Sequence, residues 1–283
     1  MIIWLDIKET SRNKRFLLFT LIFPLAWYSM MISMAKSSGF FTMSNAYLWV
    51  SAACAIGIAG NAVVTFSKKI SHTRKFYQLQ ACTSNYSMRR WLMDQMAVQI
   101  ILNLTICVVI IVAGLLMKSL AFNLNIVIML VLFSLMGIYL SAIGFLLGIF
   151  VDSRTLDALS MPLSMVFGML MVRLDTWLSG NVIVAITTVQ KFFPGYYLFG
   201  IVEKMILKQN FSNEFLKFLL SCSLMVIPFM IVVIVQHKQY ESFHDFKVVV
   251  DDFINYYNNH RIKQKLNGLS PVQYRQLTTE SVS

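Results

Sequence analysis

The sequence predicts an all-α polytopic membrane protein. We expect six transmembrane helices, an N-terminal interfacial helix, an external re-entrant hairpin between spans five and six, and a short helical C-terminal tail. Three observations support this fold class: the composition, six long apolar segments and an uneven distribution of basic residues. Apolar residues make up 57% of the chain and charged residues 13%, whereas soluble proteins are about 45–50% apolar and about 25% charged. A lipid bilayer is therefore the expected solvent for most of the chain.

Six segments are long enough to span a bilayer, which requires about 20 mostly apolar residues. They are residues 16–35, 46–66, 96–117, 126–150, 156–178 and 217–235. The fifth has the weakest pattern, because Arg173 and Asp175 lie near one end of it. These two side chains could form an ion pair at the outer end, or each could extend separately to the membrane interface.

The basic residues predict the orientation of the chain. The formal net charge is +11, but the lysines and arginines lie in short segments between the apolar runs, which does not suggest nucleic-acid binding. Seventeen of them fall in residues 1–15, 67–95, 151–155 and 236–283, against six in the opposite loops. Because basic loops stay in the cytoplasm, we expect both termini to be cytoplasmic.

The residues before the first span suit a short interfacial helix. In "MIIWLDIKETSRNKR" the apolar start is followed by basic residues, and Trp4 would lie at headgroup level. A disordered start is an equally good interpretation of so short a segment.

The external segment 179–216 is apolar, yet neither of its halves is long enough to span. "NVIVAITTV" is followed by "QKFFPGYYLFGIVEKMIL". A turn is expected at Pro194–Gly195, and the hairpin residues at this point are Phe193, Pro194, Gly195, Tyr196 and Tyr197. Both lengths fit a half-membrane hairpin buried against protein. The alternative is an external amphipathic helix that lies flat on the interface.

Small residues and cysteines within the spans are expected to serve packing. Gly144 and Gly148 form a G-x-x-x-G spacing that lets helices approach closely, either inside the bundle or in a dimer. The four cysteines show no C-x-x-C spacing, and three of them lie in apolar runs, so a disulfide framework or a zinc site is not expected.

The sequence lacks the compact signatures of several enzyme and transporter classes. No span has an ionisable residue near its centre, as a proton- or ion-coupled carrier usually requires. Walker, H-E-x-x-H and G-x-S-x-G motifs are absent. We therefore expect no catalytic, cofactor-binding or metal-binding residues, and we expect the chain not to be an enzyme.

The layout of residues 1–238 resembles the membrane subunit of a type-2 ATP-binding-cassette (ABC) exporter. The resemblance rests on "RNKRFLLFTLIFPLAW" with Pro24, on the long basic loop 67–95 and on "FFPGYYL" in the external hairpin. It implies a permease in the bacterial cytoplasmic membrane, paired with an identical or different membrane subunit and with a separate nucleotide-binding ATPase that holds the ATP. The alternative is a six-span sensor or immunity-type protein that transports nothing.

In this family the loop between spans two and three contacts the ATPase. The resemblance assigns that role to Arg74, Lys75, Phe76, Tyr77, Gln78 and Leu79. A solvated basic loop that only sets topology is the other interpretation.

The last residues, 239–283, form a second segment of different character. One helical stripe collects Phe243, Phe246, Val250, Phe253, Ile254 and Tyr257. A second helix should begin at Pro271 with Ser270 as its cap. "YYNNHRIKQKLNGLSPVQYR" closely resembles the C-terminal end of integrase-type transposases of bacterial insertion elements.

The catalytic acids of those transposases lie upstream of this stretch, so the resemblance implies no activity and no functional nucleic-acid binding here. The resemblance implies a fusion, in which a transposase-derived helix-loop-helix tail of residues 239–283 became joined to the permease. A basic cytoplasmic domain that binds nucleic acid or anionic lipid is the alternative, although so short a segment rarely folds alone.

Overall fold

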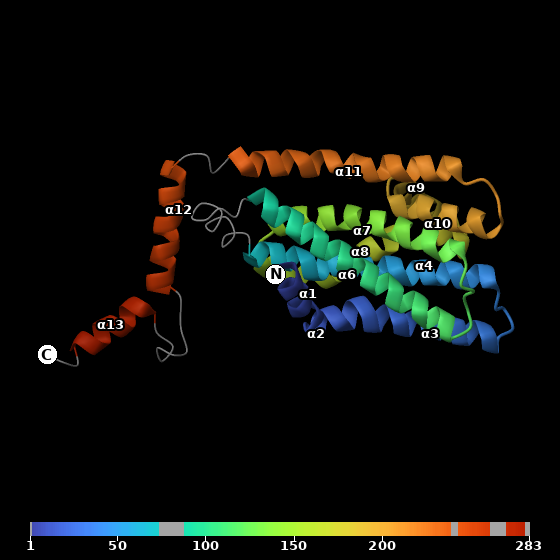
Figure 1. The fold of residues 1–283 in the computed structure, drawn as a ribbon, viewed down its shortest axis with the longest axis horizontal. Helices are drawn as coiled ribbons and strands as arrows, with labels where there is room; N and C mark the ends of the chain where they lie inside the picture. The colour runs from blue at the N-terminus through green and yellow to red at the C-terminus, as the bar shows by residue number, and fades with distance from the viewer. Residues whose placement is uncertain (1, 74–87, 239–242, 261–269, 281–283) are drawn as a thin grey trace. The chain divides into compact units, whose positions relative to one another are not determined.

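A computed structural model describes residues 2–73, 88–238, 243–260 and 270–280 (Figure 1). Every regular element in these ranges is helical: α1 (Ile2–Ser11), α2 (Lys14–Phe16), η1 (Leu17–Ile22), α3 (Phe23–Ser37), α4 (Met43–Ala59), η2 (Gly60–Phe66), α6 (Met88–Leu116), α7 (Leu124–Phe150), α8 (Ser153–Met171), η3 (Leu174–Thr176), α9 (Asn181–Gln190), α10 (Pro194–Ile206), α11 (Ser212–Lys238), α12 (Phe243–Asn255), η4 (Tyr256–His260) and α13 (Pro271–Glu280). The chain divides into a unit of residues 1–74 and 89–231 and a unit of residues 75–88 and 232–283.

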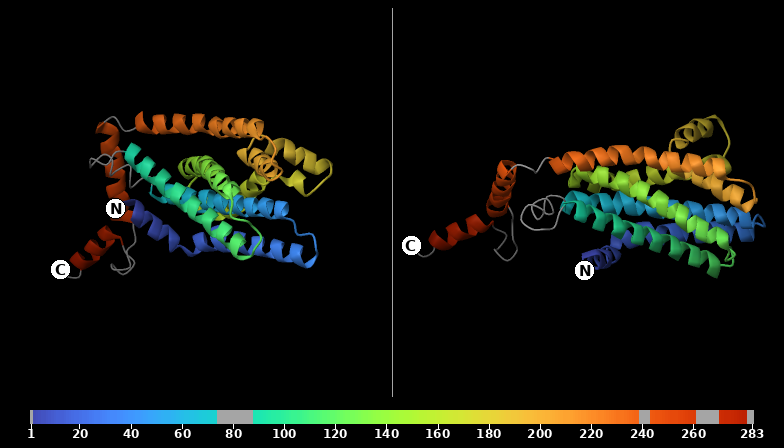
Figure 2. Two further views of the ribbon diagram at one scale, coloured as in Figure 1. Left: turned by 45° about the vertical axis from the view of Figure 1, so that its right-hand side comes forward. Right: turned by 45° about the horizontal axis from the view of Figure 1, so that its top comes forward.

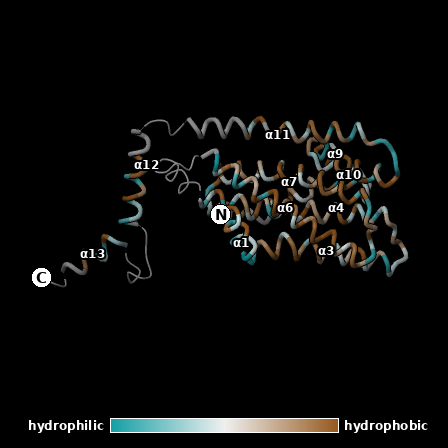
Figure 3. The backbone as a smooth tube through the Cα atoms, viewed as in Figure 1, coloured by the Kyte–Doolittle hydropathy of each residue, from teal (hydrophilic) through white to brown (hydrophobic). Residues whose placement is uncertain are grey.

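Five helices within the described residues are long and apolar enough to cross a membrane: Leu17–Ser37, Met43–Thr73, Arg90–Leu116, Leu124–Phe150 and Ser212–Phe229. Figure 2 shows α3, α4, α6 and α7 running alongside one another, and Figure 3 shows that hydrophobic residues dominate their central turns. Four predicted spans, and part of a fifth, therefore correspond to long apolar helices. The second helix is longer than the predicted 46–66, because α4 continues through η2 to Thr73.

The predicted span 156–178 differs from the structure. Helix α8 ends at Met171, and the backbone of Val172 and Arg173 is extended before the short 3₁₀ turn η3. The N-terminal half of α8 contains Arg154 and Asp157, and Pro162–Met171 is an apolar part of the helix. The polar residues at 173 and 175 belong to a turn at the end of α8 and not to a helical span.

The helix from Met43 to Thr73 lies at the centre of the larger unit. In the apolar stretch of this helix 89% of the residues are buried, whereas the corresponding value is 22% for Leu17–Ser37 and 44% for Arg90–Leu116. In its α4 part the residues are mostly small or apolar on all sides, with Ala52, Ala53 and Ala59 fully buried. A helix that is apolar all round is typical of the middle of a bundle.

Two glycines of α7 allow its close approach to η2. A Cβ atom on Gly144 would lie 2.2 Å from the backbone oxygen of Ala62, and one on Gly148 would lie 2.6 Å from that of Ser67. The G-x-x-x-G spacing is therefore an internal packing face between α7 and the central helix.

The second unit contains α12 and α13, described here by themselves. Ser270 Oγ accepts from the Gln273 backbone N–H (3.3 Å), and Gln273 Oε1 accepts from the Ser270 backbone N–H (3.0 Å). This reciprocal pair is a capping box, which confirms the predicted cap at Ser270 and helix start at Pro271. In α12 the apolar stripe is partly exposed, with Phe253 43% and Ile254 49% exposed.

The glycine contacts predict a position-specific effect of a single methyl group. Gly144→Ala would place its Cβ against backbone that cannot move aside, so we expect a loss of about 1–3 kcal/mol of stability from overpacking. Gly168→Ala is the matched control, because a Cβ there meets nothing closer than 3.7 Å. The measurement is the thermal denaturation midpoint of the detergent-purified full chain. Equal midpoints for the two variants would contradict the assigned packing.

Candidate functional site

A buried carboxylate links the N-terminal helix to the bundle. Asp6 of α1 is 7% exposed, and its Oδ2 accepts from Gln95 Nε2 (2.7 Å) and lies 3.0 Å from Lys69 Nζ. Lys69 precedes the segment 74–87, and Gln95 lies in α6, which follows it. One side chain of α1 therefore contacts both helices that flank the predicted coupling loop.

The opposite face of α1 is exposed and carries apolar residues together with charged Lys8 and Glu9. Trp4 is 69% and Leu5 53% exposed, whereas Asp6 and Thr10 point inward. A helix with this division suits a membrane interface, as predicted for residues 1–15. Its inward face carries the buried Asp6 and Thr10 beside Ile3 and Ile7, which pack against the core, and the sequence pattern did not indicate the two buried polar residues.

The same end of the bundle contains a second ion pair. Lys68 Nζ lies 2.8 Å from Asp157 Oδ1 of α8, and Ser71 Oγ donates to the backbone oxygen of Val151 (3.2 Å). These contacts connect the end of the central helix to the turn between α7 and α8. Three of the predicted cytoplasmic segments, 1–15, 67–95 and 151–155, thus contribute residues to one end of the unit.

The other end brings together segments that were predicted to be external. Lys36 Nζ donates to the backbone oxygen of Met117 (2.6 Å), and Tyr47 Oη donates to that of Ala121 (3.0 Å). These hydrogen bonds join the helix ends and the connecting segments at this end of the bundle. The predicted coupling residues, Arg74, Lys75, Phe76, Tyr77, Gln78 and Leu79, lie outside the described residues.

A cluster of amides lies inside the bundle, between the two ends. Asn61 Nδ2 donates to Gln99 Oε1 and to Asn103 Oδ1, both at 2.8 Å, and all three residues are at most 2% exposed. Gly137 of α7 makes room for it, since a Cβ there would lie 2.6 Å from Asn103 Nδ2. The sequence search for ionisable groups missed this cluster, although Gln95, Gln99 and Asn103 recur every four residues and so share one face of α6.

The predicted external hairpin corresponds to α9 and α10, which meet at 102°. Pro194 occupies the first turn of α10. Gly195 lies against α8, because a Cβ there would be 2.2 Å from the backbone oxygen of Met171. Buried Gln190 donates through Nε2 to the backbone oxygens of Met169 (2.8 Å) and Val172 (2.7 Å). The bend is therefore held against the end of α8.

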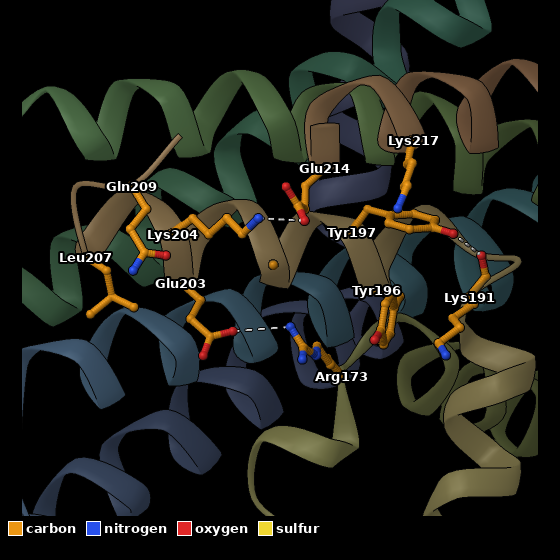
Figure 4. A pocket seen from close by; sticks show the side chains of 11 residues that line it. Arg173, Lys191, Tyr196, Tyr197, Glu203, Lys204, Leu207, Gln209, Glu214 and Lys217 are labelled. Atoms are coloured by element: carbon orange, nitrogen blue, oxygen red, sulfur yellow. Dashed lines mark hydrogen bonds and ion pairs between the residues drawn. The ribbon is translucent and has the colours of Figure 1, made fainter. Parts of the chain in front are cut away.

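An arginine beside the bend joins several polar groups. Arg173 Nε lies 2.8 Å from Asp175 Oδ1, and its Nη1 lies 3.2 Å from Glu203 Oε2 of α10. Its guanidinium also lies over the Tyr196 ring, 5.0 Å from the centroid. Figure 4 shows Arg173 directed toward Glu203 in a pocket that Tyr197 also lines. Glu203 was not among the predicted site residues, because its contact with Arg173 depends on the tertiary fold.

The comparisons with known proteins concern the C-terminal segment. Residues 232–278 match the Integrase core domain family. An uncharacterized transposase-like protein of Haemophilus influenzae is 47% identical over 38 residues, which are 13% of this chain and 18% of that protein. The chain thus spans about a fifth of the relative's length. No solved structure matches the chain.

These matches confirm the resemblance of the C-terminal segment to integrase-type transposases. They also correct one expectation. We expected the chain not to be an enzyme, and the matches to residues 232–278 contradict this, because integrases and transposases are enzymes. The motifs sought in the sequence are signatures of other enzyme classes, so their absence did not bear on this family.

The Asp6 contacts predict how α1 is attached. Asp6→Ala leaves the mostly buried Lys69 ammonium without its partner, which we expect to cost about 3–5 kcal/mol. Glu9→Ala removes an exposed carboxylate from the same helix and serves as the control. Limited proteolysis of the detergent-purified chain should show faster cleavage before residue 15 in the Asp6 variant alone. Equal cleavage rates would show that this contact does not hold α1.

Proposed function

We propose that the larger unit is the permease subunit of an ABC exporter, which pairs with a second membrane subunit and is driven by a separate nucleotide-binding ATPase. The observation that carries this proposal is the position of Asp6. A protein docked on residues 74–87 would contact the loop whose two flanking helices are both bound to α1 through that carboxylate. Movement of the loop would therefore be transmitted to α1, the Met43–Thr73 helix and α6 together.

The proposed topology has six membrane crossings with both termini in the cytoplasm of a bacterium. Five crossings would be the long apolar helices, and α8 would be the remaining one, since its 19 residues reach about 28 Å. The bent pair α9–α10 would enter the outer half of the membrane and return. The gathering of basic segments at one end of the bundle supports this orientation.

We propose that the tail derives from an insertion-element transposase that became joined to the permease. The family match begins at residue 232, inside α11 and before the boundary at 239 that the sequence suggested. The two compact units also divide between residues 231 and 232. The join would therefore lie within the last span, with the preceding residues already forming most of the crossing.

Affinity purification of the full chain from its native membranes in mild detergent tests the permease proposal. We expect a nucleotide-binding ATPase in stoichiometric amount, and at least about tenfold less of it with Arg74→Glu/Lys75→Glu, because charge reversal opposes docking. The control is Lys118→Glu/Lys208→Glu, which reverses two exposed charges at the other end of the bundle. Intact, inserted chain with no ATPase would favour the sensor or immunity-type alternative.

Truncation tests the proposal for the tail. A chain ending at residue 240 should insert in the membrane, and the ATPase should copurify with it in the same amount as with the full chain. A chain ending at residue 211, which lacks α11, should lose both properties and serves as the comparison. If the chain ending at 240 also failed, the tail would be an integral part of the permease and the junction proposal would be overturned.

A further inference from the structure

A charged pocket of about 540 Å³ lies beside the bend between α9 and α10 (Figure 4). Its size is within the range of small-ligand sites. Four basic residues line it: Arg173, Lys191, Lys204 and Lys217. Two acidic residues, Glu203 and Glu214, complete its charged lining.

The acidic residues neutralise only part of the basic charge. Arg173 pairs with Glu203 (3.2 Å) and Lys204 with Glu214 (2.8 Å). With Asp175, which pairs with Arg173 at 2.8 Å, four cations face three anions. Among the described residues, Lys191 and Lys217 form no ion pair. The pocket thus carries net positive charge that falls on these two exposed lysines.

An apolar groove of about 450 Å³ adjoins this pocket and shares Lys191, Tyr197 and Lys217 with it. From Lys217 the groove continues along α11 past Leu220, Leu224 and Ile227, which are 60–62% exposed. The spacing of these residues puts them on one face of the helix, over about 15 Å.

The far wall of the groove comes from the hairpin. Phe192 lines it and is 69% exposed, and its backbone oxygen accepts from Ser221 Oγ at 2.8 Å. This hydrogen bond joins α11 to the hairpin, and so connects the two walls of the groove. Tyr197 Oη donates to the backbone oxygen of Lys191 (2.8 Å), which holds the residues at the junction together.

We propose that the charged pocket and the groove form one binding site for an anionic phospholipid. The phosphate would lie between Lys191 and Lys217, where it makes charge-assisted hydrogen bonds. An acyl chain would cover the exposed stripe of α11. A free phosphate would leave the stripe uncovered, and a lipid with no net charge would not neutralise the excess positive charge of the pocket. The site does not depend on coupling to an ATPase.

Native mass spectrometry of the detergent-purified full chain tests this site. Dioctanoyl phosphatidylglycerol should bind with one-to-one stoichiometry. Dioctanoyl phosphatidylcholine and glycerol 3-phosphate should each bind at least about tenfold more weakly, because the first has no net charge and the second has no acyl chain.

Two pairs of variants separate the charged and apolar contributions. Lys191→Gln/Lys217→Gln should weaken phosphatidylglycerol binding about tenfold or more, whereas Lys8→Gln/Arg12→Gln, which removes two exposed charges from the other end, should not. Leu220→Ala/Leu224→Ala should weaken it about tenfold, whereas Leu216→Ala/Leu219→Ala, which alters α11 outside the groove, should not.

Three results would overturn the proposal. Equal binding of the anionic and zwitterionic lipids would show that the charge of Lys191 and Lys217 does not contribute to lipid binding. Equal binding of glycerol 3-phosphate and the lipid would reduce the site to a phosphate pocket. A dimer that excludes lipid, and dissociates in Leu220→Ala/Leu224→Ala, would show that a second copy of the chain covers the groove.

Discussion

The close contact between α7 and the central helix is the constraint on which the rest of the bundle depends. In lipid, helices gain little from the hydrophobic effect when they associate, so backbone proximity and packing must hold them together. Gly144 and Gly148 provide that proximity on one side of the Met43–Thr73 helix. On another side, a Cβ on Gly57 would lie 2.8 Å from Ile106 Cγ2 and 3.0 Å from the backbone oxygen of Thr20. The central helix is thus in close contact with α7, α6 and η1.

This arrangement determines where polar side chains can lie. Gln95, Gln99 and Asn103 form a stripe along α6 that begins at Asp6 and ends at Asn61. Because an unpaired amide in an apolar interior is costly, the stripe fixes the rotation of α6 about its axis. Turning α6 would break the contact at the end of the bundle and those in its middle together. We infer that a displacement of α6 caused by binding near residues 74–87 would also disturb the hydrogen bonds of the amide cluster.

Sequence reasoning predicted the features that depend on local pattern. Long apolar runs identify helices because backbone groups in lipid must be satisfied internally, and the Ser270 cap follows from a short motif. Other features depend on tertiary contacts. The end of α8 at Met171 follows from its packing against Gly195 and Gln190. The partner of Arg173 on α10 could not be identified, since 30 residues separate the two.

The family match begins inside α11, so the matched residues and the residues before them form one continuous helix. A helix is stabilised by backbone hydrogen bonds between residues four apart. It therefore continues wherever the next residues can adopt the helical backbone and suit an apolar environment. Val232, Val233, Ile234 and Val235 are apolar, and they fall inside the matched segment. They extend α11 although they resemble part of another family.

Helix α12 differs, because its stripe requires a surface to pack on. Phe253 and Ile254 remain exposed within the described residues, where that surface is not supplied. Extension of an apolar helix thus requires only compatible apolar residues, whereas burial of an amphipathic helix requires a surface that covers its apolar stripe.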